Sequence, residues 1–584
     1  MFHVEYRFLI LIKKYRFYPL NFIFLLATSL ITACFFKVDF GNSTPLVQET
    51  IVADSLPQAI FLPMIHNDSW YSSYESEKEW TQDAHDAQRS GYIDLEPAEP
   101  WTFLWSWNGP DAQGGSRAHF YDAPWEARAV TGGEYIYVPA GNKGIYALNK
   151  ASGEQAWHIT DSAFDAAPAY DMKSGYLYAG GSNGILYQID THTGKIVKTY
   201  QSGSSINKAI LLANGFVYAL NANGELHKID PETMKPVWIY RANSAAATPA
   251  AYSSQYDTII FCTADLYVHA VNNSNGSQRW KVKPTSLSPS STHTFEGYWP
   301  VIAEQHGVVF VRMNLGFDGL WSGSGAGHIY PNTNSETRAL LSSHPQYKNL
   351  FALDIDNGNE AFIPAIGFGG VEYQPGSNPI LLVGSMPVIR RYPDGSEVAY
   401  QLFRNGQSQP PDGRWDSHLG EMVLDSSTIP GLVAGDMRFV QYDDSYIYIS
   451  DEQTPLSMAG NTLFNAHWAA SEAAWIVDRS AGKGMTYTNP ITTQRRPTVI
   501  RRMKSCQDYN PQTHYTTCGL YLFADSRYWP GPGWWVYWNT LDPPTISTAP
   551  YGGGILPRYT YVSSGLIVVE GNGGELMVFR HSGN

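Results

Sequence analysis

The sequence predicts an all-β fold, a β-propeller with eight four-stranded blades, and two observations carry this prediction. Four stretches of the chain repeat at a period of 40 to 42 residues, beginning at Gly144, Gly184, Gly224 and Leu266. In addition, 14% of the residues are aromatic, and glycine and proline are abundant, with 52 and 36 residues among 584. A fixed period of about 40 residues, with several short strands in each unit, is typical of a propeller blade.

Each repeat has the same order of elements. An apolar run precedes each aligned segment, and the four runs are 135–138, 176–179, 216–219 and 259–262. Three of the four repeats end in a tryptophan, namely Trp157, Trp238 and Trp280. We expect the glycine turn to close a hairpin and the tryptophan to fill the wedge between adjacent blades.

The pattern continues more loosely along the rest of the chain. Apolar runs recur at 307–311, 379–383, 446–449, 520–523 and 566–569, and a further repeat ending at 351–358 is displaced by an insertion near 313–349. This gives nine candidate inner hairpins, one more than the usual eight. We expect eight blades, with residues 520–538 elaborating a neighbouring blade, and a ring of seven is the alternative.

The sequence also indicates how the ring closes. The final repeat stops at 573–579 and lacks the strand that carries the tryptophan, whereas a matching strand, Trp101-Thr-Phe-Leu-Trp-Ser-Trp107, lies near the first repeat. We expect residues 100–108 to pair as the outer strand of the last blade, because this closure removes two exposed sheet edges.

The repeat consensus resembles a known family. The segment from Ala147 to Trp157, Ala-Leu-Asn-Lys-Ala-Ser-Gly-Glu-Gln-Ala-Trp, resembles the repeat of pyrroloquinoline-quinone-type (PQQ-type) propellers, and clear repeats cover residues 118–285. That family contains quinoprotein dehydrogenases and also non-catalytic lipoproteins, such as the propeller subunit of the bacterial outer-membrane β-barrel assembly machinery. The resemblance therefore implies two alternatives, an oxidoreductase and an assembly module.

The dehydrogenase alternative implies a quinone in the central funnel, a calcium or lanthanide ion and a catalytic aspartate. Most such enzymes also carry two adjacent cysteines, and this sequence has neither a Cys-Cys pair nor a Cys-x-x-Cys-His haem site. We therefore expect the non-catalytic branch, with no catalytic residue and no cofactor. PQQ with Ca²⁺ belongs only to the alternative.

The N-terminal residues predict the compartment. Lys13, Lys14 and Arg16 precede an apolar run at 22–34, which is the order of an export signal. The ending Ile31-Thr-Ala-Cys34 resembles a bacterial lipobox and would make Cys34 the lipidated residue. An uncleaved anchor and simple secretion are the alternatives. We expect a signal or anchor at 1–36, an extracytoplasmic tether at 37–78 and a propeller at 79–584.

The remaining cysteines agree with export. Cys262 lies alone on an apolar strand, whereas Cys506 and Cys518 flank a polar, turn-rich segment. In an oxidising compartment we expect these two to form a disulfide, which would stabilise the fold by roughly 3 kcal/mol in the loop-closure model.

Several short motifs have plainer explanations than a site. Asp354 and Asp356 begin a calcium-loop pattern, but the glutamate at its twelfth position is missing, and a hairpin turn accounts for the same residues. Ser182 lies in a Gly-x-Ser-x-Gly sequence between two expected strands, where a nucleophile elbow needs a helix. The glycines at 323–327 precede no helical pattern. Asp416, His418 and Glu421 could ligate a metal, but a hydrogen-bonded structural pair is favoured, and we expect no metal site.

The most unusual composition lies at 527–538. Alternation along a strand would place aromatic side chains on both faces, so one face could pack between blades and the other could form a platform for sugars or peptides. The residues of this possible ligand platform are Tyr528, Trp529, Trp534, Trp535 and Trp538.

Charge excludes one class of partner and leaves others. The formal net charge is −14, and no basic stripe interleaved with aromatics follows residue 40, so nucleic-acid binding is not expected. We expect a membrane-tethered propeller that binds envelope or secreted proteins through loops at 313–349, 451–475 and 500–520. A quinone-dependent oxidoreductase and a glycan-binding propeller are the alternatives.

Overall fold

The computed structural model of the chain divides into two compact units, residues 1–67 and 68–584. All the residues that the structure describes belong to the second unit. They are 78–97, 102–107, 109–110, 123–315, 333–366, 370–372, 380–382, 385–392, 395–403, 418–426, 431–439, 455–467, 471–478, 487–488, 495–496, 499–501, 507–510, 515–517, 521–524, 535–536, 547–548, 557–571 and 576–581.

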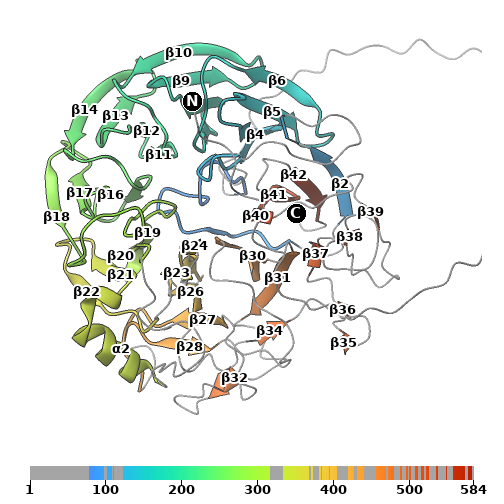
Figure 1. Cartoon of the computed structure of the whole chain (residues 1–584). Coiled ribbons are helices and arrows are strands. Elements are labelled where there is room, and N and C mark those ends of the chain that lie inside the picture. Colours follow the sequence, from blue (N-terminus) through green and yellow to red (C-terminus); the bar gives the residue numbers. More distant parts are fainter. Residues whose placement is uncertain are drawn as a thin grey trace, which may run out of the picture. The chain divides into compact units, whose positions relative to one another are not determined.

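Eight antiparallel sheets form the blades of a β-propeller (Figure 1). Blades 1 to 4 follow the sequence repeats with four strands each. Blade 1 contains β3 (Val130–Gly132), β4 (Tyr135–Pro139), β5 (Ile145–Asn149) and β6 (Gln155–Ile159). Blade 2 contains β7 (Ala169–Asp171), β8 (Tyr176–Gly180), β9 (Ile185–Asp190) and β10 (Lys195–Gln201). Blade 3 contains β11 (Leu211–Ala213), β12 (Phe216–Leu220), β13 (Glu225–Asp230) and β14 (Lys235–Arg241). Blade 4 contains β15 (Ala251–Ser253), β16 (Thr258–Cys262), β17 (Val268–Asn272) and β18 (Gln278–Val282).

The other four blades come from the irregular part of the sequence. Blade 5 contains β19 (Val301–Ala303), β20 (Val308–Arg312), β21 (Leu350–Asp354) and β22 (Glu360–Phe362). Blade 6 contains β25 (Val388–Arg391), β26 (Glu397–Phe403), β27 (His418–Met422) and β28 (Met437–Phe439). Blade 7 is built on β29 (Leu456–Ala459), β30 (Thr462–His467), β31 (Ser471–Asp478) and β37 (Tyr521–Ala524). Blade 8 contains β40 (Pro557–Ser563), β41 (Leu566–Gly571), β42 (Leu576–Arg580) and, from the start of the described chain, β2 (Thr102–Trp107).

Two sequence predictions about the ring are confirmed. β2 pairs with β42, from Thr102 opposite Arg580 to Trp107 opposite Leu576, so an N-terminal strand closes the last blade. The run at 520–538 contributes β37 and β38 (Trp535–Val536) to the sheet of blade 7, together with β39 (Ser547–Thr548), so it elaborates that blade and adds no ninth one. A short strand, β34 (Val499–Arg501), also pairs with β31.

The prediction of a loop at 451–475 is wrong, because the described residues of this segment form β29, β30 and the start of β31. The other two expected loops also differ from the prediction. The insertion near 313–349 contains a helix, α2 (Asn334–Ser343), and a 3₁₀ turn, η2 (Pro345–Tyr347). A second 3₁₀ turn, η1 (Glu304–His306), joins the first two strands of blade 5. The region at 500–520 contains a hairpin of β35 (Gln507–Asn510) and β36 (Tyr515–Thr517). Two further small hairpins are β23 (Gly370–Glu372) with β24 (Ile380–Leu382) and β32 (Tyr487–Thr488) with β33 (Arg495–Arg496).

Strand alternation separates the connections between two faces of the ring. The insertion of blade 5 joins its second and third strands, whereas residues 479–520 join the third and fourth strands of blade 7. Because successive strands run in opposite directions, these two connections leave from opposite faces. The predicted loops therefore do not share one surface.

The hydrophobic core lies between the blades. Strand β16 is buried along its whole length because neighbouring sheets cover both of its faces, whereas the outer strand β10 has mostly exposed side chains. One core cluster joins β4 and β5 to β8 and β9 across the joint of blades 1 and 2, and equivalent clusters fill the following joints. β-branched and aromatic residues suit such strands, because their side chains interdigitate on a pleated surface.

In four joints between described blades, a tryptophan makes the same contact with the next blade. In the joint of blades 1 and 2, Trp157 donates its indole N–H to the backbone oxygen of Thr191 at 2.7 Å, and its ring lies on Gly194 in the next hairpin. A Cβ built on Gly194 would lie 2.6 Å from the ring, and this glycine has φ +67°, so only glycine fits there. The same contact joins Trp105 to Gly153, Trp238 to Gly276 and Trp280 to Gly358.

The joint of blades 2 and 3 departs from this rule. Lys198 stands opposite Gln188, which is the register position that the tryptophans occupy in blades 1, 3 and 4. The glycine is replaced by Met234, which has φ +50° and a buried side chain. The Lys198 ammonium donates to the backbone oxygen of Glu232. Tryptophan and glycine are therefore absent together, and a methionine fills the space that the missing ring would take.

Candidate functional site at the centre of the ring

Residues 78–96 run through the middle of the ring, where Figure 1 draws them in blue. This axial segment accepts a backbone hydrogen bond from each of the eight blades. Its partners are the backbone N–H groups of Ser564 (2.8 Å), Thr131 (2.8 Å), Tyr170 (2.8 Å), Leu212 (3.0 Å), Tyr252 (2.7 Å), Ile302 (3.0 Å), Ile389 (2.9 Å) and Met458 (2.8 Å). Seven of these bonds go to backbone oxygens, and the bond of Leu212 goes to the side chain of Gln82. The segment thus acts as a hub for the inner strands.

The hub curves because several of its residues take the left-handed backbone conformation. Ala84, His85 and Arg89 have φ angles of 54°, 77° and 54°. Such angles are uncommon for residues other than glycine and persist only where surrounding contacts fix them. Beyond this curve, β1 (Tyr92–Ile93) pairs in parallel with β29 of blade 7.

A buried ion cluster fixes the hub to blade 1. The Asp83 carboxylate accepts hydrogen bonds from Arg128 at 2.6 and 2.8 Å and from Arg89 at 3.3 Å. Burial disfavours the charged carboxylate, but the two guanidinium groups outweigh burial and hold the pKa of Asp83 below its ordinary value. Arg89 also donates to the backbone oxygen of Ala250 at 2.6 Å in blade 4. A buried charge is tolerated when it is paired and hydrogen-bonded in this way.

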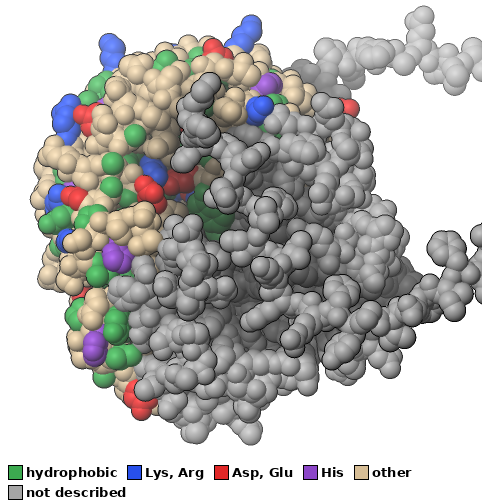
Figure 2. Space-filling view, in the orientation of Figure 1, with side chains coloured by type: hydrophobic (Ala, Val, Ile, Leu, Met, Phe, Trp, Pro, Cys, Tyr) green, Lys and Arg blue, Asp and Glu red, His purple; other side chains and the backbone are tan. Residues whose placement is uncertain are grey.

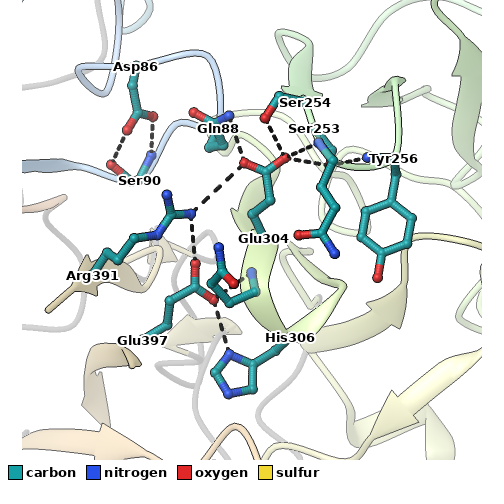
Figure 3. Close-up of polar contacts among 12 residues, drawn as sticks. Asp86, Gln88, Ser90, Ser253, Ser254, Tyr256, Glu304, His306, Arg391 and Glu397 are labelled. Carbon is teal, nitrogen blue, oxygen red and sulfur yellow. Dashed lines mark hydrogen bonds and ion pairs between the residues drawn. The ribbon is translucent and has the colours of Figure 1, made fainter. Parts of the chain in front are cut away.

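A second cluster ties the hub to blades 4, 5 and 6 (Figure 3). One oxygen of Glu304 accepts from the hydroxyls of Ser253 and Ser254 and from the backbone N–H of Gln255, at 2.9, 3.0 and 2.7 Å. Its other oxygen accepts from Gln88 of the hub at 3.1 Å and lies 4.0 Å from Arg391. Glu304 therefore connects three blades and the axial segment.

Glu397 extends this cluster into blade 6. Its carboxylate contacts Arg391 at 3.1 Å, His306 at 3.0 Å and the backbone N–H of Gln305 at 2.9 Å. Burial opposes the charge, but the hydrogen bonds and Arg391 outweigh it and keep the pKa of Glu397 below its ordinary value. In the space-filling view, acidic and basic side chains lie together near the middle of this face, and hydrophobic side chains are scattered (Figure 2).

These carboxylates bind their own chain, which limits what the centre can do chemically. Asp83, Glu304 and Glu397 each accept several hydrogen bonds from neighbouring blades. Within the described residues, no group of three or more His, Cys, Asp or Glu side chains could hold a metal ion. The arrangement positions strands and offers no poised acid, base or nucleophile among these groups.

Two tryptophans near the axis have their ring faces covered. A flat cofactor needs an exposed aromatic face, but the guanidinium of Arg128 lies 4.6 Å above the ring of Trp299. Trp80 stacks on Tyr561 with ring centroids 5.2 Å apart and is only 1% exposed. Trp125, whose indole N–H donates to the backbone oxygen of Gly297 at 3.2 Å, is partly exposed.

The short motifs are turns and strands where the structure describes them. The Asp354 carboxylate accepts the backbone N–H groups of Asp356 and Asn357 at 2.8 and 3.1 Å, so it caps a hairpin turn. Ser182 lies between β8 and β9 and donates to the carboxylate of Asp165. His418 begins β27, which also contains the buried Glu421, whereas Asp416 and residues 323–327 lie outside the described residues.

The predicted site residues lie mostly outside the described part of the chain. This holds for Cys34, Cys506, Cys518, Tyr528, Trp529, Trp534 and Trp538, whereas Trp535 begins β38. The disulfide stays a prediction, because Cys506 and Cys518 both lie outside the described residues. Cys262 is confirmed as a buried free thiol on β16. No helix among the described residues has the length and hydropathy needed to cross a bilayer.

Sequence reasoning missed the hub and its ion cluster. Residues 79–91 carry none of the repeat features that identify the blades. Their one available signal is the charge of Asp83, Asp86 and Arg89, and charged residues usually lie on the surface. Arg128 lies 45 positions from Asp83, so no local pattern could have paired them.

The chain is similar to known proteins over its repeats. A family model described as outer membrane protein assembly factor BamB matches residues 141–311. No curated protein sequence matches the chain. Among solved structures, BamB from Moraxella catarrhalis is similar at 10% identity and a TM-score of 0.42, covering 82% of this chain and 100% of that one. The quinohemoprotein alcohol dehydrogenase ADHIIG from Pseudomonas putida is similar at 13% identity and a TM-score of 0.44, covering 87% of this chain and 81% of that one.

The repeat consensus and the matched family model agree over residues 141–311, so the repeats of this chain are similar to those of PQQ-like β-propellers.

Proposed function

We propose that this protein is an assembly module of the bacterial cell envelope, held at a membrane by its N-terminal region, whose propeller binds protein partners. The main support is the filled centre of the ring. Because the axial segment bonds to all eight blades, the ring is a rigid frame whose binding surfaces are its faces and rim. The matched family model, named for an outer membrane assembly factor, supports the same class of function.

The insertion of blade 5 is the proposed docking element. Helix α2 begins at an N-cap, Thr333, whose side chain accepts the backbone N–H of Glu336. Asn334 exchanges two hydrogen bonds with the backbone of Met437 in blade 6, at 2.9 and 3.2 Å, and Arg338 pairs with Asp436. These contacts fix the insertion across two blades, and a preorganised surface loses less entropy on binding than a flexible one.

Replacing residues 333–343, which contain α2, with a short Gly-Ser linker tests this docking role. Blade 5 should survive, because β20 and β21 pair through their own backbone. We expect the ring to keep a cooperative melting transition, but the variant should no longer copurify the envelope protein that a photo-crosslinking probe on α2 captures in the unaltered chain. A matched probe at Val237, on the rim of blade 3, should give no such crosslink. Retained copurification by the linker variant would argue against docking at the insertion.

Cys34→Ser tests the proposed membrane attachment. If Cys34 carries a lipid, the variant should move from the membrane fraction to the soluble extracytoplasmic fraction after cell fractionation, since a lipid chain supplies most of the membrane affinity. An uncleaved anchor would keep the variant in the membrane with its N-terminal residues intact by mass spectrometry. Recovery of the variant in the cytoplasm would contradict export itself.

A further inference from the structure

The joints between the first five blades differ in one equivalent pair of positions. In each joint, one residue comes from the outer strand of a blade and the other from the third strand of the next blade. From the joint of blades 1 and 2 to that of blades 4 and 5, the pairs are Ile159 with Tyr187, Tyr200 with His227, Tyr240 with His269, and Val282 with Phe351. Ile159 and Tyr187 share one apolar cluster, and Val282 packs against the cluster of Phe351. The joints on either side of blade 3 instead contain a tyrosine and a histidine.

Both histidines are buried and hydrogen-bonded across the joint. His227 is 2% exposed, and its Nδ1 lies 2.9 Å from the Tyr200 hydroxyl. His269 is fully buried, and its Nδ1 lies 2.8 Å from the Tyr240 hydroxyl, while its Nε2 lies 3.1 Å from the Thr263 hydroxyl. Each imidazole therefore holds two blades together through a polar contact where the flanking joints are apolar.

The charged groups around each imidazole are already paired. Beside His227, Glu225 lies 3.7 Å from Nε2 and is bonded to Arg241 at 2.9 Å. Beside His269, Asp265 pairs with Lys281 at 3.7 Å, and Phe261 stacks on the ring at 5.2 Å. A protonated imidazole would thus be buried next to a neutralised acid, which stabilises its charge poorly.

Burial lowers the pKa of both histidines from 6.5 to about 4. The folded joints therefore bind fewer protons than the opened ones between these values, and their stability falls as the pH drops below 6.5. At pH 5 the shift corresponds to a roughly 30-fold larger opening constant for each histidine, and to roughly 300-fold once the pH is below 4.

We propose that the two joints of blade 3 form an acid-sensitive seam, in which protonation of His227 and His269 places a buried charge at their contacts with Tyr200 and Tyr240 and loosens blade 3 from its neighbours. The two joints of the seam differ in one respect, because the joint of blades 3 and 4 keeps the contact of Trp238 with Gly276. The joint of blades 2 and 3 has Lys198 and Met234 in place of tryptophan and glycine, so it lacks the contact that would hold it closed after protonation. The inference does not depend on the proposed function.

Hydrogen exchange of the full chain at pH 7 and pH 5, corrected for intrinsic exchange rates, tests the seam. We expect opening of β10, β13, β14 and β17 to increase roughly 30-fold, with little change in β5 and β21. His581, buried in blade 8 with a pKa of about 4, should add a separate response there. An increase of equal size in all blades would overturn the proposal.

Two sets of variants separate the seam from general acid unfolding. His227→Gln with His269→Gln keeps a hydrogen-bonding side chain that does not titrate, and the response of blade 3 should disappear. Tyr200→Ile, His227→Tyr, Tyr240→Val and His269→Phe together copy the apolar joints and should have the same effect. His192→Gln, at an exposed hairpin, is the matched control and should respond like the unaltered chain. A persisting blade 3 response in the glutamine variant would refute the role of the histidines.

Discussion

Deleting residues 96–110 is expected to abolish the cooperative unfolding transition of the ring. The deletion removes β2, which supplies five paired positions along β42 and closes the eighth blade. It also removes Trp105, whose indole donates to the backbone oxygen of Lys150 at 2.9 Å and whose ring covers Gly153 in blade 1. Without these contacts the first and last blades are joined only near the axis, for example by Thr131 and Ser563 at 2.6 Å, and two sheet edges become exposed.

A graded variant makes this expectation quantitative. Trp105→Ala keeps the strand but removes a ring that is 7% exposed, and it should lower the free energy of unfolding by about 3–5 kcal/mol. Urea unfolding followed by circular dichroism measures both variants. Val237→Ala, at a side chain that is 51% exposed, should change stability by less than about 0.5 kcal/mol. An unchanged transition in the deletion variant would mean that β2 is not needed to close the ring.

The sequence predicted those parts of the fold that depend on local repetition. The period of about 40 residues placed blades 1 to 4, and the unmatched strand at 101–107 identified the closure, because a missing element and its replacement have the same sequence pattern. The tryptophans of three of the four repeats were assigned correctly to the wedge between blades. Its partner glycine could also have been inferred, since Lys198 and Met234 depart from the consensus together.

The centre of the ring could not be predicted in the same way. The hub makes its contacts mainly through backbone oxygens, and any residue can supply these. Asp83 and Arg128 form an ion pair that only the closed ring brings together. Blades 6 and 7 were placed less well because insertions break the period, so strands β29 and β30 lay within an expected loop.

Each joint can be given the residue pair of the other, either tryptophan with glycine or lysine with methionine. The effects of the two substitutions on the free energy of unfolding should then be strongly coupled. In the joint of blades 1 and 2, Gly194→Met should cost about 3 kcal/mol or more, because the new side chain meets the ring of Trp157 and the backbone has φ +67°. Trp157→Lys should cost a similar amount by leaving the wedge empty. The double variant copies Lys198 and Met234, and it should cost clearly less than the sum of the two, with a coupling of about 1–3 kcal/mol.

The reverse exchange in the joint of blades 2 and 3 provides the matched test. Lys198→Trp alone should destabilise, since Met234 occupies the space for the ring. Met234→Gly alone relieves the positive φ angle but loses a buried side chain, so its net effect should be small. Combining both should give a variant more stable than either single change, measured by urea unfolding. Additive effects in both joints would mean that the tryptophan ring and the hairpin residue do not interact energetically. The joint absence of tryptophan and glycine between blades 2 and 3 would then have no structural cause.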